Sequence, residues 1–107
     1  MDVARLRQLA SEHASADFGR PESIHLCNLQ AGQIRSALLA GLAVNRPEVF
    51  SYLDDPTLGP WIAYCALDAG ALSAEDEFRC LAVIKAVAAG QGLESIGASH
   101  WLAQRGV

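Results

Sequence analysis

Three thiols, Cys27, Cys65 and Cys80, are the residues of this sequence best suited to chemistry. A thiolate can be a nucleophile or a metal ligand, but either role needs particular neighbours. Structural zinc sites present two ligands from one turn or knuckle, and no pair with that spacing occurs here. The pair that comes closest to such spacing is His25 with Cys27. On a helix, however, these two side chains would point about 200° apart. We therefore predict no metal site and no cofactor.

Catalysis by a cysteine requires a lowered thiol pKa, caused by a helix N-terminus or a neighbouring cation. Cys65 and Cys80 fall within predicted helices on apolar faces, where a thiol is inert. Cys27 is the best candidate because it precedes a predicted helix start, but no arrangement of cysteine and histidine accompanies it. The charged first residues do not resemble a secretory signal. We predict a cytoplasmic protein with free thiols that is not an enzyme.

The stretch WIAYCALDAG, residues 61–70, gathers an indole, a phenol, a thiol and a carboxylate in one short run. At about 100° per residue, its apolar side chains cover nearly the whole circumference of a helix, which is typical of a buried helix. Pro60 suits the first turn with Asp55 or Thr57 as the cap, and Gly70 suits the C-terminal end. Asp68 must then reach the surface near the helix end or meet a partner such as an arginine.

Two groups of carboxylates resemble acid–base or Mg²⁺ groups: Asp54 with Asp55, and Glu75 with Asp76 and Glu77. Both stand at predicted helix starts, where side-chain oxygens cap free N–H groups and the helix dipole favours negative charge. Helix capping is therefore the ordinary interpretation of both groups of carboxylates. The alternative is an acidic rim that a basic partner recognises.

The net charge of −4 lies entirely in the second half of the chain. Residues 1–53 carry five acids and five bases, whereas residues 54–107 carry seven acids and three bases. Nucleic acids and anionic membranes bind clustered cations, so this distribution disfavours both. The charge-free runs fall short of the ~18 apolar residues that a spanning helix requires. Another protein, with a basic surface as one option, remains the predicted partner.

Apolar residues recur with helical periodicity along the chain, and the alternation typical of strands is almost absent. Short connections containing glycine or proline separate the helical segments. We predict one domain, residues 1–107, folded as an all-α compact orthogonal bundle of five to six short helices. The predicted helices run from about 2 to 14, 29 to 44 (after a turn from Glu22), 45 to 55, 57 to 69, 73 to 89 and 94 to 105.

Two classes of function remain open. The first is a small protein-binding module, such as an inhibitor, immunity protein, adaptor or chaperone, that acts by steric occlusion. The second is a DNA-binding or transcription-associated regulator, because residues 73–105 have the spacing of a helix-turn-helix. The second helix of that pair opens with LESIGASHW, which lacks residues suited to reading bases, so we favour the first class.

The predicted partner-binding residues combine acids that attract a basic surface with aromatic side chains that anchor it. Homo-oligomerisation is compatible with either class, because the apolar fraction is high for so short a chain. The predicted residues are Asp54, Asp55, Glu75, Asp76, Glu77, Tyr52 and Trp101.

Overall fold

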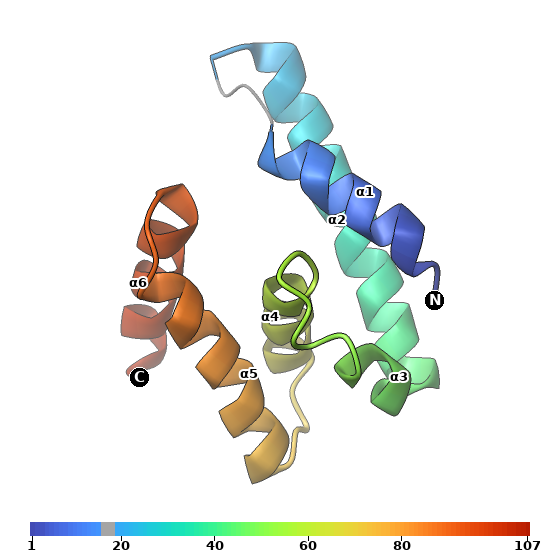
Figure 1. The fold of residues 1–107 in the computed structure, drawn as a ribbon, viewed down its shortest axis with the longest axis vertical. Helices are drawn as coiled ribbons and strands as arrows, with labels where there is room; N and C mark the ends of the chain where they lie inside the picture. Colours follow the sequence, from blue (N-terminus) through green and yellow to red (C-terminus); the bar gives the residue numbers. More distant parts are fainter. Residues whose placement is uncertain (16–18) are drawn as a thin grey trace.

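The computed structural model describes residues 1–15 and 19–107, and over these residues the chain is an all-α globule of six helices without strands (Figure 1). This confirms the predicted fold class. Part of the predicted loop after the first helix, residues 16–18, lies outside the described residues. The helices are α1 (Val3–Ala14), α2 (Pro21–Val44), α3 (Arg46–Phe50), α4 (Gly59–Ala69), α5 (Ala74–Ala88) and α6 (Leu93–Arg105).

Capping side chains and a C-terminal glycine fix several helix ends. The side-chain oxygen of Asn45 accepts a hydrogen bond from the N–H of Glu48 at 3.3 Å and so begins α3. Ser73 begins α5 in the same way, because its hydroxyl oxygen accepts from the N–H of Asp76 at 3.1 Å. Gly70 follows α4 with a φ of 75°, a conformation that glycine adopts without steric strain.

The longest helix, α2, differs from the prediction. We expected a turn from Glu22 and a separate helix from about residue 29, but α2 is one helix of 24 residues beginning at Pro21. Proline fits this first position because its missing N–H would have no partner there, and Arg20 before it is extended. Cys27 therefore does not precede a helix start. It lies in the second turn of α2 and is only 4% exposed, which removes the reason for regarding it as the most reactive thiol.

The helices form two pairs joined by α4 (Figure 1). In one pair α1 packs along α2, and in the other α5 packs against α6. α4 lies between the pairs and contacts both α2 and α5, while α3 packs against α2. The molecule measures 41 × 30 × 19 Å, and its shortest dimension is less than two helix diameters of about 10–12 Å each. Helices in so thin a molecule keep much of their surface open to solvent.

α4 supplies the centre of the core, as its apolar circumference predicted. Ile62, Ala63 and Ala66 are at most 1% exposed. At the start of α4, Trp61 contacts α1, because the His13 ring stands edge-on to the indole with the ring centroids 5.0 Å apart. The other elements pack buried side chains into the same core, among them Leu6, Ile34, Leu38, Leu58, Cys80, Ile84 and Ala98.

The sequence left open whether Asp68, near the end of α4, reaches the surface or pairs with an arginine, and in the structure it does both. Its side chain is 40% exposed, and one carboxylate oxygen accepts a hydrogen bond from the Arg35 guanidinium of α2 at 2.9 Å. The Arg35 side chain is itself 50% exposed. Water and salt screen a pair this exposed, so it contributes little to stability.

Gly59, the first residue of α4, allows the backbone of Leu53 to approach closely, so we expect this position to be sensitive to substitution. A Cβ at Gly59 would lie 2.3 Å from the carbonyl oxygen of Leu53, so the backbone would have to shift. We expect Gly59→Ala to lower the free energy of unfolding by about 1–3 kcal/mol, as overpacking does. Gly97→Ala is the matched control, because a Cβ there meets nothing within 4 Å. It should raise stability by about 0.5–1 kcal/mol in urea unfolding, and equal effects at the two sites would contradict this account.

Candidate functional site

The three thiols lie inside the molecule. Cys27, Cys65 and Cys80 are 4%, 2% and 0% exposed. Burial in apolar surroundings disfavours the thiolate and raises the pKa of Cys65 and of Cys80 to about 11. Within the described residues, no group of three or more His, Cys, Asp or Glu side chains is placed to hold a metal ion. The three cysteine side chains thus fill space between helices, and Cys65 and Cys80 stay protonated at neutral pH.

The prediction that Asp55 or Thr57 caps α4 is wrong, because the N-cap is Leu58 and makes no side-chain capping hydrogen bond. Asp55 stabilises the preceding turn instead. One carboxylate oxygen accepts hydrogen bonds from the N–H groups of Thr57 and Leu58, both at 2.9 Å, in the turn that leads into α4. The other accepts from Nε of Arg7 on α1, also at 2.9 Å. These hydrogen bonds, the one from the Leu58 N–H above all, hold the pKa of Asp55 below its ordinary value. Its side chain is 11% exposed, whereas its neighbour Asp54 lies on the surface.

The acids at the start of α5 stand at the positive end of the helix dipole, as predicted. Glu75 and Glu77 are exposed, and Asp76 is half-buried. One oxygen of Asp76 lies 4.0 Å from Nη1 of Arg79, one turn along the helix. Asp76 and Arg79 also line a shallow hollow of about 400 Å³ beside α3. The remaining residues that line this hollow are Arg46, Pro47, Phe50 and Ser51.

The two predicted aromatic anchors are half-buried against their own chain. Tyr52 lies under the Arg7 guanidinium, whose central carbon is 6.0 Å from the ring centroid. Trp101 stands edge-on to Tyr64 of α4 at 5.3 Å, and the Arg105 guanidinium covers it at 4.7 Å. Both aromatic side chains therefore have structural contacts, and whether they also contact a partner stays a prediction.

Sequence reasoning missed the most exposed aromatic side chain among the described residues, Phe78 of α5, which is 73% exposed. The position of Phe78 on a helical wheel could have indicated this exposure. Phe78 lies about 160° around the helix from Cys80, and Cys80 is fully buried. The solvent side of α5 therefore carries Phe78 close to Glu75 and Ala82, which are three residues before it and four residues after it.

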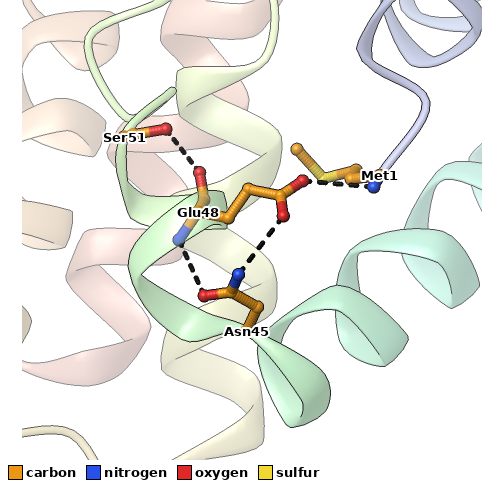
Figure 2. Close-up of polar contacts among 4 residues, drawn as sticks. All are labelled: Met1, Asn45, Glu48 and Ser51. Carbon is orange, nitrogen blue, oxygen red and sulfur yellow. Dashed lines mark hydrogen bonds and ion pairs between the residues drawn. The ribbon is translucent and has the colours of Figure 1, made fainter.

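A second surface feature is a groove of about 400 Å³ between α1, α2 and α3. Figure 2 shows the polar contacts beside it, in which Glu48 of α3 is the hub. One of its carboxylate oxygens lies 3.1 Å from the amino group of Met1, and the other accepts from the Asn45 amide at 3.4 Å. The Ser51 hydroxyl donates to the Glu48 backbone carbonyl. These contacts hold Met1, two residues before α1, against α3 at one end of the groove.

The α5–α6 pair was the basis of the helix-turn-helix alternative. The two helices do follow each other across a short turn at residues 89–92. The exposed residues in the first turn of α6 include Leu93 and Ile96, which cannot hydrogen-bond to base edges, and Glu94, whose charge would repel phosphates. Arg105, in the last turn, covers the ring of Trp101 instead.

No family model, curated protein or solved structure matches the chain. Among the described helices, none is both long enough and apolar enough to cross a membrane.

We expect the burial of the thiols to make them slow to react. In the folded protein at pH 8, the Ellman reagent should modify the three cysteines at least about 100-fold more slowly than in the urea-unfolded chain. Burial limits access to all three thiols, and the raised pKa also suppresses thiolate formation at Cys65 and Cys80. Absorbance at 412 nm follows the reaction directly. A folded-state thiol that reacts as fast as free cysteine would contradict the buried placement.

We expect Asp55 to make stability depend on pH in the acid range. Because its pKa is lower in the folded state, its contribution is complete above the ordinary carboxyl pKa of about 4 and is lost as the pH falls through that value toward the folded one. Asp55→Ala should cost about 0.5–2 kcal/mol at pH 7 and flatten the fall in stability below about pH 4. Asp54→Ala is the exposed control, and an equal effect from it in urea unfolding at pH 7 and pH 3 would refute the assignment.

Proposed function

We propose that the chain is a non-catalytic protein-binding module of the inhibitor, immunity or adaptor type, which acts by covering the surface of a protein partner. The observation that carries the proposal is Phe78, a large aromatic ring that is 73% exposed on the acidic start of α5. Interface hot spots are commonly aromatic side chains that enter a pocket on the partner.

The charges around this ring favour a basic partner. Glu75 and Glu77 precede Phe78 in sequence, both are exposed, and neither has an ion-pair partner within the described part of the chain. By contrast, Asp55 and Asp68 are each paired with an arginine, so they contribute less to the outward field. The exposed unpaired carboxylates of the second half are therefore closest together at the start of α5, where Phe78 also projects, and they give this surface a negative potential. Such potential steers encounter with a cationic surface and raises the association rate.

The mechanism that fits this arrangement is steric occlusion. Phe78 enters an apolar pocket on the partner, while Glu75 and Glu77 contact a cationic rim around that pocket. Asp76 and Arg79 extend the same surface toward α3 through the shallow hollow described above. A rigid helical scaffold limits the entropy lost on binding, so the occluding surface needs no lid or cofactor.

Affinity capture with matched variants tests this proposal. The tagged wild-type chain should recover one protein in stoichiometric amount from extracts of its native cell. Phe78→Ala should weaken binding of that protein at least about 10-fold, because truncating a hot spot costs ~2 kcal/mol or more. Leu93→Ala is the matched control, since Leu93 is also 73% exposed but lies on α6. Capture that is unaffected by Phe78→Ala would contradict the proposal.

With the partner purified, Glu75→Lys combined with Glu77→Lys should act mainly on the association rate, as steering charges do. The rate measured by surface plasmon resonance at low salt should fall about 10-fold or more, with a smaller change in the dissociation rate. Unchanged association would refute the steering role. Retention of the chain on duplex DNA, falling steeply with salt, would instead favour the regulator alternative.

A further inference from the structure

The shallow hollow between α3 and α5 is a cationic patch on an acidic chain. Arg46, the first residue of α3, and Arg79, in the second turn of α5, both line it, and Asp76 is the one acid among the described residues that do so. Two guanidinium groups against one carboxylate leave the hollow a net charge of +1, whereas the whole chain carries −4. The hollow therefore favours an anionic group, in contrast to the acids beside it.

The other acids of α3 and of the start of α5 do not cancel this charge. Glu48 of α3 lines the groove beside α1 instead, where its carboxylate pairs with the amino group of Met1 at 3.1 Å. Glu75 and Glu77 precede Arg79 on α5, but neither of them lines the hollow, and the ion pair that Arg79 forms is with another residue. The positive charge of the hollow is thus left open to a ligand.

Both guanidinium groups have unused hydrogen-bond donors. A guanidinium carries five N–H donors. That of Arg46 donates one long hydrogen bond, from Nη1 to the carbonyl oxygen of Ala71 at 3.4 Å. That of Arg79 makes no hydrogen bond within the described residues, because the carboxylate of Asp76 lies 4.0 Å away, too far for one. Most donors of the two groups are therefore available to an anion.

An aromatic ring holds Arg79 in position. Its central guanidinium carbon lies 5.8 Å from the ring centroid of Phe50, a buried residue that also lines the hollow. A cation–π contact stabilises the charged group where it stands, so less side-chain entropy is lost when a ligand binds. A guanidinium fixed in this way presents parallel N–H groups, the geometry that binds both oxygens of a carboxylate.

We propose that this hollow receives the carboxylate of an aspartate or glutamate side chain of the protein partner. This inference rests on the function proposed above. A carboxylate carries the single negative charge that neutralises the hollow, and the methylene groups behind it contact Pro47 and Phe50. The hollow is too shallow to bury most of a small molecule, as a ligand pocket does, whereas a side chain presented by a second protein needs no enclosing cavity.

The hollow continues the surface that carries the aromatic anchor, because Arg79 directly follows Phe78 on α5. The partner therefore carries an acidic side chain next to the cationic rim that contacts Glu75 and Glu77. Opposite charges placed side by side fix the register of two surfaces. They also discriminate against a purely basic partner, which would place a cation against the two arginines.

A titration followed by NMR tests the hollow without the partner. The probe is N-acetylglutamic acid N-methylamide, which carries one side-chain carboxylate, and the uncharged glutamine analogue is its control. The acidic probe should shift the Nε–Hε signals of Arg46 and Arg79 saturably at millimolar concentration, and leave that of Arg5 on α1 unchanged. Arg46→Gln should weaken its binding at Arg79 by about 3-fold, the loss of one exposed ion pair.

Three results of this titration would overturn the proposal. They are the absence of a saturable shift, equal shifts with the glutamine analogue, and binding of inorganic phosphate at least about 10-fold tighter than the acidic probe, which would assign the hollow to a phosphate group.

The captured partner supplies the second test. Arg46→Gln and Arg79→Gln should each weaken its binding at least about 10-fold, mainly through faster dissociation, because each leaves the partner's carboxylate poorly paired. Lys85→Gln removes the same charge from the same helix and is the matched control. If Phe78→Ala weakens capture while both arginine variants behave like Lys85→Gln, this inference is overturned and the proposed function stands. Failure of the wild type to capture any protein would overturn both.

Discussion

The burial of α4 between α2 and α5 is the packing contact on which this fold depends. The two helix pairs, α1 with α2 and α5 with α6, are joined mainly through this helix of 11 residues. Its apolar circumference serves both pairs at once, so a polar side chain at Ile62, Ala63 or Ala66 would have no route to water. The one charged residue of the helix, Asp68, stands at its end, where the carboxylate reaches the surface.

A core built around one short helix makes a thin molecule with much outer surface for its mass. The side chains that could take part in chemistry or binding are therefore divided between the core and the surface. The three thiols are buried in the core, while carboxylates and several large apolar side chains remain on the surface. The surface therefore offers shape, apolar contact and negative charge, which are the means by which one protein binds another. Exposed large apolar side chains lie on α2, α5 and α6, and the exposed unpaired acids gather at the start of α5.

Local features of the structure could be predicted from the sequence, because they depend on neighbouring residues. The caps Asn45 and Ser73, the end of α4 at Gly70 and the burial of α4 follow from short-range hydrogen bonding and periodicity. Contacts between distant segments could not be predicted. Arg7 and Asp55 are 48 residues apart, and nothing near Asp55 indicates that α1 will supply its partner. The continuity of α2 was missed because a weak helical pattern near its start gains stability only from packing against the rest of the fold.

The place of α4 in the chain also bears on how the protein is made. α1 and α2 leave the ribosome first, and their apolar faces, with Ile34 and Leu38, have no cover until α4 follows them. Synthesis adds about 5–20 residues per second, so the remaining residues up to the end of α4 take on the order of seconds to appear. During that interval the nascent helical hairpin exposes its future core, and a chaperone bound then would have the most apolar surface to protect.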